Sequence, residues 1–305
     1  MIMHIILQQQ RKNIYKRIIL LILIFATHSI GEGQTKKVRS ILEESRDNCV
    51  KISVHSTNSL GTGFFLDDLH IATCFHVIGS WQINQSVNPP EANILLGTGI
   101  KVLLEDGEVI DAEIVTPTPT TNIKLQEAPS PNTQTLLTPV IQDFAVLKLK
   151  SKPKAIIKAN PIYTEKNLPQ IGSDILFSGY PFGTPAMITH KGMISGMAAG
   201  DQLICIQAPI NKGNSGGALL TTKGEIIGIV SDREGGISLG LQELSKYIEN
   251  TKKEGSVLIM GVDQLAVTKE IIQTLDTYIS TGIGYARPVK YLKDYLNKNP
   301  EILKK

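Results

Sequence analysis

The stretch Gly213–Gly217 reads GNSGG and joins two short apolar runs, Leu203–Ile210 and Ala218–Leu220. Glycines on both sides of a serine permit turns that other residues resist, and such a turn can direct two backbone N–H groups at one point. A serine hydroxyl is a poor nucleophile unless a positioned base activates it. Two interpretations are therefore open: a glycine-rich hairpin turn between strands, or a nucleophile beside an oxyanion-binding site.

Short apolar runs separated by Gly, Pro, Asp and Asn fill most of the chain from Cys49 onward. Many short strands with turn residues between them are typical of an all-β barrel or sandwich. Asp67 and Asp68 predict a tight hairpin turn between two of these strands. The runs are Cys49–His55, Gly63–Leu66, Leu69–Thr73, Ile94–Leu96, Glu108–Val115, Phe144–Leu149, Asp174–Ser178, Met187–Met197, Leu203–Gln207, Gly216–Leu220 and Glu225–Ser231.

Other segments depart from this strand pattern. Thr116–Pro139 is rich in Thr and Pro and predicts an exposed loop, and Ser151–Pro161 predicts a connector between two halves of the chain. Apolar residues recur at helical spacing in Leu241–Ile248 and in Val267–Tyr278, which predicts a partly helical insertion. Val289–Leu296 predicts a final amphipathic helix.

The N-terminus has the pattern of a secretory signal. Four basic residues between Arg11 and Arg17 precede the apolar run Ile18–Ala26, and small residues follow it. The run is shorter than the ~20 residues of a membrane-spanning helix. We therefore predict a signal peptide over residues 1–31 and a periplasmic or secreted protein, with no stable membrane span after signal removal. An uncleaved anchor is the alternative.

Charge and cysteine content exclude several classes of function. The net charge of +3 is slight and gives no case for nucleic-acid binding. No C-x-x-C or H-E-x-x-H spacing is present, so we expect no metal and no cofactor. An exported protein could pair two of Cys49, Cys74 and Cys205 in a disulfide, but the apolar runs around Cys74 and Cys205 favour buried free thiols.

His76 and Asp143 are the candidates for a base and its partner acid. His76 lies in the apolar run Leu69–Ile78, and no other histidine has a better context. Asp143 directly precedes the apolar run Phe144–Leu149. Taken singly, a core histidine and a surface turn residue are the commoner interpretations. The order His76, Asp143, Ser215, however, is the order of the triad in chymotrypsin-like barrels.

With these motifs in this order, the chain resembles the trypsin/chymotrypsin-like serine peptidases, and most closely their HtrA/Deg branch. The resemblance runs over about residues 46–297, and it rests on the succession of the matches rather than on any one of them. The matching stretches are Gly61–Phe65, Ile71–Ile78, Asp143–Lys148, Ile171–Ser173, Gly179–Gly183, Gly192–Ser195, Ile210–Leu219 and Gly282–Pro288.

The resemblance implies an all-β fold of two packed six-stranded antiparallel β-barrels, with the site in the cleft between them. The N-terminal barrel would span residues 46–150 and the C-terminal barrel residues 161–297. A partly helical insertion would occupy residues 233–281, and a C-terminal helix would follow the last strand.

The same resemblance implies a role for each site residue. His76 would take the proton of Ser215 and later give it to the leaving amine, while Asp143 would hold His76. The N–H groups of Gly213 and Ser215 would form the oxyanion hole. Ser231 would hydrogen-bond the catalytic acid, and its strand would pair with the substrate backbone. An ordinary serine at a strand end is the alternative interpretation of Ser231.

The resemblance also bears on substrate preference. Pro209, six residues before Ser215, resembles the floor of the S1 pocket, where trypsin-like enzymes carry an acid that receives Lys or Arg. Because Pro209 has no charge, and because Ile283 and Tyr285 would narrow the pocket, we expect cleavage after small or medium apolar residues. Asn214 replaces the acid that pairs with a newly cut N-terminus in zymogens, so no activation beyond signal removal is expected.

The chain departs from the HtrA/Deg pattern in three places. The interval between His76 and Asp143 is longer, the insertion replaces a short loop, and the sequence ends at Lys305 without a PDZ domain. We expect an exported serine endopeptidase that acts on proteins or peptides, in an oligomeric state that the sequence leaves open. The alternative is a peptide-binding or scaffolding protein with a latent site. An esterase or lipase fits less well, because the serine is not in a G-x-S-x-G elbow.

Overall fold

The computed structural model describes residues 41–125, 131–165, 167–198, 200, 202–233, 239–251, 255, 257–278 and 281–303. The predicted signal peptide lies outside these residues. The chain divides into a unit over residues 1–43 and a unit over residues 44–305, and the second unit holds every feature discussed below. Within the described residues, no helix combines the length and the apolar character needed to cross a membrane.

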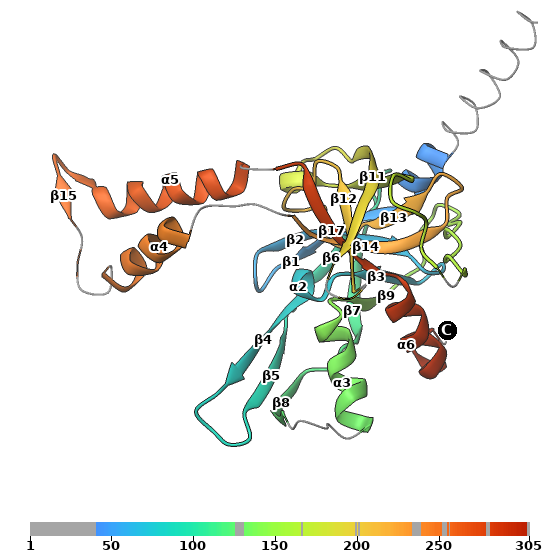
Figure 1. The fold of residues 1–305 in the computed structure, drawn as a ribbon, viewed down its shortest axis with the longest axis horizontal. Coiled ribbons are helices and arrows are strands. Elements are labelled where there is room, and N and C mark those ends of the chain that lie inside the picture. The colour runs from blue at the N-terminus through green and yellow to red at the C-terminus, as the bar shows by residue number, and fades with distance from the viewer. Residues whose placement is uncertain are drawn as a thin grey trace, which may run out of the picture. The chain divides into compact units, whose positions relative to one another are not determined.

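Six antiparallel strands close the first barrel, in the order β1-β2-β3-β9-β7-β6 (Figure 1). Its interior is filled by large apolar side chains such as Ile52, Phe64 and Leu147, all fully buried. The strands are β1 (Cys49–Val54), β2 (Ser59–Phe65), β3 (His70–Thr73), β6 (Ile100–Leu103), β7 (Val109–Thr116) and β9 (Ala145–Leu149).

A second barrel closes in the order β10-β11-β12-β17-β14-β13, and its neighbouring strands are also antiparallel. Ile175, Phe177, Ile194 and Ile204 belong to its core. The predicted pair of six-stranded barrels is therefore confirmed. The strands are β10 (Asp174–Gly179), β11 (Ile188–Ala198), β12 (Leu203–Gln207), β13 (Ala218–Thr221), β14 (Ile226–Arg233) and β17 (Ile283–Pro288).

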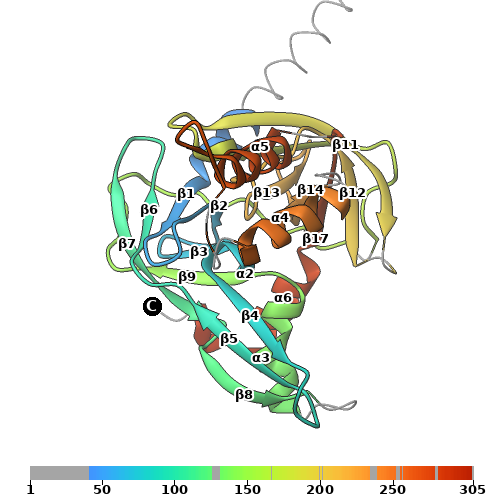
Figure 2. The ribbon, with the colours of Figure 1, turned by 90° about the vertical axis from the view of Figure 1, so that its left-hand side faces the viewer.

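The prediction of an exposed loop over Thr116–Pro139 is wrong. This segment contains β8 (Thr120–Lys124) and the start of α3 (Pro131–Ile141), which lie side by side (Figure 2). Thr is a good strand former, and Pro is tolerated in the first turn of a helix. Burial of Leu137 and Val140 then holds α3 in place despite Pro139 inside it.

Strand β8 pairs with β5 (Glu91–Leu96), which in turn pairs with β4 (Gly79–Asn84), and the three form a sheet outside both barrels. His76 lies just beyond the end of a strand. The apolar run that contains it is split, because β3 ends at Thr73 and the one-turn helix α2 (Phe75–Ile78) follows. Helix α2 buries Phe75, Val77 and Ile78 and leaves the His76 side chain 48% exposed.

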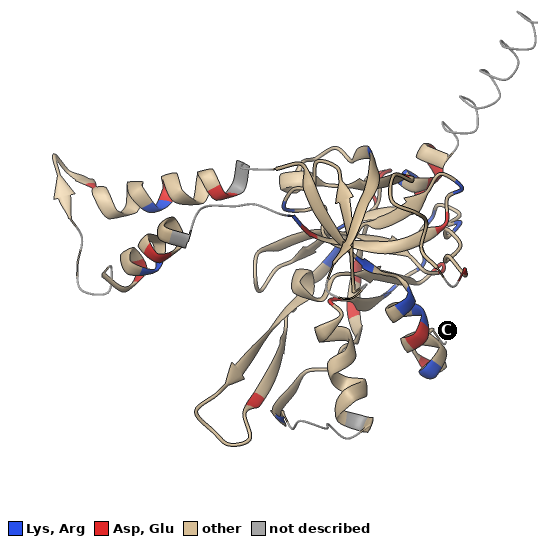
Figure 3. Cartoon of the chain, in the orientation of Figure 1, with Lys and Arg blue, Asp and Glu red and all other residues tan. Residues whose placement is uncertain are grey.

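The three predicted helices are confirmed as α4 (Leu239–Thr251), α5 (Gln264–Tyr278) and α6 (Lys290–Lys298). Between α4 and α5 lie two short paired strands, β15 (Leu258–Ile259) and β16 (Val262–Asp263). Helices α4 and α5 contact each other outside the two barrels. Figure 3 shows residues of both charge signs interspersed along α4, α5 and α6. Two 3-10 turns complete the fold, η1 (Pro181–Gly183) and η2 (Pro300–Leu303).

Candidate active site

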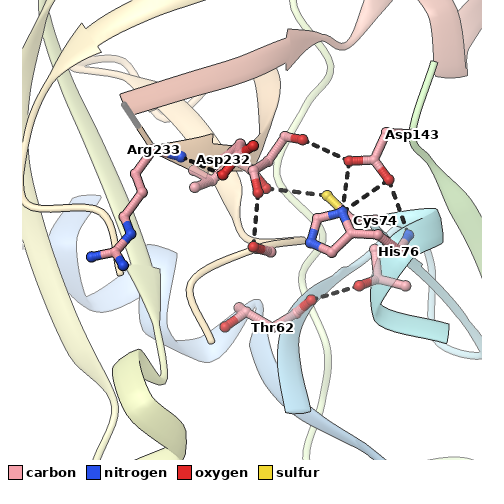
Figure 4. A network of polar contacts seen from close by, with 10 residues as sticks. Thr62, Cys74, His76, Asp143, Asp232 and Arg233 are labelled. Atoms are coloured by element: carbon pink, nitrogen blue, oxygen red, sulfur yellow. Dashed lines mark hydrogen bonds and ion pairs between the residues drawn. The ribbon is translucent and has the colours of Figure 1, made fainter. Parts of the chain in front are cut away.

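A hollow of about 1070 Å³ lies where residues of the two barrels meet. This volume is sufficient for a ligand of several residues. Both barrels and their connecting segments line the hollow, and among its lining residues are His76, Asp143, Ser215, Gly213, Ser231 and Tyr285. Six of the residues named by the sequence analysis therefore share one site, and Figure 4 shows the polar contacts around His76 and Asp143.

Strand pairing brings His76 and Asp143 together. In the register of β3 and β9, Thr73 lies opposite Ala145, so the residues just beyond these strand ends meet at one edge of the first barrel. Nδ1 of His76 lies 2.9 Å from Oδ2 and 3.0 Å from Oδ1 of Asp143. The backbone N–H of His76 also donates to Oδ1, at 3.0 Å. The carboxylate thus holds both the ring and the backbone of the histidine.

Ser231 adds a further contact to the carboxylate from the second barrel. Its hydroxyl donates to Oδ2 of Asp143 at 2.6 Å, across 88 residues of sequence. The side chain of Asp143 is 13% exposed, and its two oxygens accept from the ring and backbone of His76 and from Ser231. A carboxylate with this many donors is held in its ionised form and in one orientation.

The charges of the pair stabilise each other. Burial lowers the pKa of His76, but the hydrogen bond and the negative charge of Asp143 raise it, and the net pKa lies above its ordinary value. Burial raises the pKa of Asp143, but His76 and Ser231 lower it, and the net pKa lies below its ordinary value. The imidazole of His76 is therefore a better proton acceptor than an isolated histidine.

The Ser215 hydroxyl has a different partner from the one expected. It donates to the backbone oxygen of Ser231 at 2.8 Å, and within the described part of the chain no hydrogen bond joins it to His76. Ser215 and His76 nevertheless line the same hollow. In sites without substrate, catalytic hydrogen bonds are often long or misaligned and tighten when substrate binds.

The turn around Ser215 leaves two N–H groups unused. Among the described residues, neither the N–H of Gly213 nor that of Ser215 donates to a protein acceptor, and both residues line the hollow. The N–H of Phe182 donates to the carbonyl of Lys212 at 2.6 Å. This carbonyl belongs to the same peptide group as the N–H of Gly213, so that peptide group is already held at its oxygen. The turn can therefore offer two donors to one anion.

Only glycine fits at position 213. Its φ of +98° is disfavoured for residues with a side chain, and a Cβ there would lie 2.3 Å from the carbonyl oxygen of Tyr180. Tyr180 is in turn held by Thr62 of the first barrel, whose hydroxyl accepts from the N–H of Tyr180 at 3.2 Å and donates to the carbonyl of Gly213 at 2.6 Å. Contacts from both barrels thus set the shape of the turn.

The structure separates the predicted substrate-binding residues into two groups. Ser231 and Tyr285 line the hollow that contains Ser215. Pro209 and Ile283 instead line a second hollow of about 780 Å³, and Ser215 is not among the residues that line it.

Ile210, which the sequence analysis did not single out, lines the hollow beside Ser215. The side chains of successive residues in an extended segment point to opposite sides. This alternation is the sequence signal that could have shown that Ile210 and Pro209 line different hollows. The same hollow is also lined by Trp81, Asp232, Arg233 and Arg287, none of which was predicted to line the site.

The three cysteines are free, as predicted; Cys49 and Cys74 are buried and Cys205 is half-buried. Cys74, His76 and Asp143 offer metal-ligand atoms within 4.8 Å of one another. Burial raises the pKa of the Cys74 thiol well above its ordinary value, and this thiol donates to the carbonyl of Val230 at 3.2 Å. Because metals bind the thiolate, a protonated thiol and a carboxylate already occupied by hydrogen bonds fit a metal poorly.

Comparisons with known proteins bear on the family and the fold of the chain. Residues 61–229 match the sequence model of a family described as a trypsin-like peptidase domain. A protein of Brucella suis named probable periplasmic serine endoprotease DegP-like is 26% identical over 245 residues, which covers 75% of this chain and 40% of that protein. The putative serine protease HhoA of Synechocystis sp. is 28% identical over 204 residues, which covers 61% of this chain and 51% of that protein.

A solved structure of the serine endoprotease from Yersinia pestis has the same fold, with a TM-score of 0.50 and 20% identity. That match covers 86% of this chain and 65% of the Yersinia chain. The chain thus spans 40% and 51% of the lengths of the two curated relatives. These matches confirm the resemblance on which the sequence analysis relied.

Proposed function

Because the chain belongs to the trypsin-like peptidase domain family, we propose that it is an exported serine endopeptidase with His76, Asp143 and Ser215 as its catalytic residues. One observation carries the proposal: the Asp143 carboxylate binds Nδ1 of His76 in the same hollow that holds Ser215. With Nδ1 as the donor to Asp143, Nε2 of the neutral ring is the atom left to accept a proton.

The chemistry begins with attack of the Ser215 hydroxyl on a peptide carbonyl, while Nε2 of His76 takes the hydroxyl proton. Asp143 stabilises the imidazolium that forms, and the N–H groups of Gly213 and Ser215 stabilise the oxyanion. The imidazolium then protonates the leaving amine, and an acyl-enzyme remains. A water molecule, deprotonated by His76, hydrolyses the ester and restores Ser215.

Substrate binding supplies the step that frees the nucleophile. The Ser215 hydroxyl donates to the carbonyl of Ser231, at the end of β14. A substrate strand that pairs with β14 presents its own backbone N–H to that carbonyl. The hydroxyl of Ser215 then turns from Ser231 to Nε2 of His76, so the competent arrangement forms when a peptide is bound.

Four uncharged residues in the lining of the two hollows support a preference for small or medium apolar residues before the cleaved bond. None of Pro209, Ile210, Ile283 and Tyr285 carries a charge that would receive Lys or Arg. Apolar pockets distinguish side chains that differ by one methylene by only ~1–3 kcal/mol, so this preference is broad. Dominant cleavage after Lys or Arg in a peptide library would contradict it.

Export rests on the basic and apolar segment at the N-terminus and on the word periplasmic in the name of the Brucella relative. Fractionation of cells that express the full chain tests this part, with recovery outside the cytoplasm as the expected result. A protein retained in the cytoplasm at full length would contradict export without bearing on the catalytic residues.

A second candidate function is peptide binding by a latent site. The observation that favours it is the hydrogen bond that directs the Ser215 hydroxyl to Ser231 instead of His76. If this arrangement persisted with peptide bound, the hollow would bind peptides without cleaving them.

Labelling with a fluorophosphonate probe separates the two functions. We expect covalent labelling of the wild type, none of Ser215→Ala, and wild-type labelling of Ser195→Ala, a serine of the other hollow. The probe reacts only with a serine that a base activates beside an oxyanion hole. A folded wild type that stays unlabelled would favour the latent site.

A further inference from the structure

Arg287 is a cation of the active-site hollow that the catalytic mechanism does not use. Along β17, Tyr285 and Arg287 line the hollow, whereas Ala286 between them belongs to the core of the second barrel. This alternation is the period of a strand. Arg287 is therefore held on a rigid barrel strand with its side chain on the substrate side.

Among the residues that the structure describes, Arg287 has no anionic partner. Its Nε is buried and without a hydrogen bond, and no ion pair involves Arg287 within the described residues. Arg287 is half-buried, and a guanidinium carries five N–H donors and no acceptor, so its buried Nε–H is unfavourable unless a ligand satisfies it. The other two cations of the hollow differ, because Lys212 and Arg233 both bind Asp276.

The two acids of the hollow do not satisfy Arg287. Asp143 accepts from His76 and Ser231, as described above. Asp232 is exposed, and its carboxylate accepts from the backbone N–H of Arg233 at 2.7 Å. Asp232 raises and Arg287 lowers the pKa of His76, so both charges act on the same site without pairing with each other. The guanidinium remains available for an acid that arrives with the substrate.

The position of Arg287 places that acid close to the cleaved bond. Arg287 lies opposite Ile229 in the register of β14 and β17, two residues along β14 from Ser231. The Ser231 carbonyl is 2.8 Å from the Ser215 hydroxyl, so the substrate residue that pairs with it is the one whose carbonyl is attacked. Arg287 therefore lies close to the cleaved bond, and substrate residues on either side of that bond can approach its guanidinium.

We propose that Arg287 forms a carboxylate-binding subsite, through which the enzyme prefers substrates with Glu or Asp within three residues of the cleaved bond. This inference rests on the proposed function. A carboxylate can receive two parallel N–H···O bonds from one guanidinium, an arrangement that an amide or an ammonium does not reproduce. The subsite adds an acidic requirement to the apolar preference next to the bond.

The test compares peptides that differ only in Glu or Gln at one position within three residues of the cleaved bond, with Val directly before that bond. For the wild type we expect kcat/KM to be about tenfold higher with Glu at the best position. The ratio should fall to about one in Arg287→Gln and to an intermediate value in Arg287→Lys, which keeps the charge without the planar fork. The control Lys290→Gln, a nearby cation that does not line the hollow, should keep the wild-type ratio.

Binding is measured separately in the Ser215→Ala variant. Trp81 is the single tryptophan of the chain and lines the hollow, so its fluorescence reports peptide binding without catalysis. We expect tighter binding of the Glu peptide in Ser215→Ala and equal binding in Ser215→Ala/Arg287→Gln. Circular dichroism and thermal unfolding confirm that each variant is folded.

The two measurements distinguish failure of the inference from failure of the proposed function. Binding that prefers Glu through Arg287, without cleavage by the wild type, would support the subsite and count against the peptidase. Equal values for the Glu and Gln peptides, a preference that survives in Arg287→Gln, or no peptide binding at all would each overturn the subsite.

Discussion

At the scale of single residues, His76, Asp143 and Ser215 are each held in place by a hydrogen bond to a neighbouring residue. His76 is exposed enough to meet a substrate, and Asp143 is buried enough to keep its charge in a fixed direction. Ser231 contributes twice, with its hydroxyl on Asp143 and its carbonyl on Ser215. Through Ser231, the second barrel therefore binds both the candidate acid Asp143 and the candidate nucleophile Ser215.

The raised pKa of His76 predicts the pH dependence of catalysis. The base must be neutral to accept the serine proton, so kcat/KM should fall as the pH decreases through the pKa of His76. Because Asp143 raises that pKa, the midpoint should lie above the ordinary value of 6.5. In Asp143→Asn the midpoint should move down and kcat should fall about 10⁴-fold. A wild-type midpoint below the ordinary value would contradict the pairing.

Gly213 predicts the cost of losing one oxyanion donor. In Gly213→Ala the backbone cannot keep its φ of +98° against the Tyr180 carbonyl, so the N–H turns away from the hollow. We expect kcat to fall about 10²–10³-fold with little change in KM. Gly172→Ala is the matched control, because Gly172 also has a positive φ of +89° but has open space around its Cβ position. An equal loss of kcat in both variants would indicate backbone strain, and not the loss of an oxyanion donor, as its cause.

At the scale of elements, helix α5 supports the turn that carries Gly213. The carboxylate of Asp276 binds Nζ of Lys212 at 2.9 Å, and the Asp276 carbonyl accepts from the guanidinium of Arg233. Lys212 directly precedes Gly213, and Arg233 ends β14. The insertion is therefore connected to both the oxyanion turn and the strand proposed to pair with substrate.

Asp276→Asn tests this connection. The Lys212–Asp276 pair is largely exposed, so its loss should change the free energy of unfolding by less than about 1 kcal/mol. We nevertheless expect kcat to fall several-fold, because the oxyanion turn loses a support. The control Glu249→Gln removes a partner of Lys269 between α4 and α5 and should leave kcat unchanged. Identical kinetics in the two variants would show that α5 does not act on the turn.

At the scale of the whole molecule, Thr62 joins the two barrels behind the site. Its hydroxyl donates to the carbonyl of Gly213, and its N–H donates to the carbonyl of Ser215 at 2.8 Å. Thr62 is completely buried on β2 of the first barrel. Positions of the oxyanion turn and of His76 therefore depend on how the barrels pack against each other.

Thr62→Val keeps the side-chain shape and removes the two hydrogen bonds that the Thr62 hydroxyl makes with Gly213 and Tyr180. A buried acceptor left without its donor should lower the free energy of unfolding by about 1–3 kcal/mol, and kcat should fall with it. Thr189→Val is the control, because the Thr189 hydroxyl bonds Ser178 at 2.9 Å within the second barrel alone. Denaturant unfolding and peptide hydrolysis of the two variants give the comparison. A loss of stability without loss of kcat in Thr62→Val would show that the barrels do not align the site through Thr62.

Sequence alone determined an all-β fold and the three later helices, because each depends on a short-range pattern, and the family resemblance of the ordered motifs then indicated two barrels. Alternating apolar residues, a glycine-rich turn and helical spacing are readable over a few positions. Thr116–Pro139 was misjudged for the same reason, since burial of Leu137 and Val140 against distant residues overrides a local composition that favours a loop.

Only the tertiary structure decided which groups touch. Ser231 reaches Asp143 across 88 residues, and the Ser215 hydroxyl binds the Ser231 carbonyl rather than His76. The structure also placed Ile210 beside Ser215 and Pro209 in another hollow, and among the described residues it left the buried Nε of Arg287 without a hydrogen bond. These contacts depend on strand register and on the packing of one barrel against the other, which no pattern over neighbouring residues encodes.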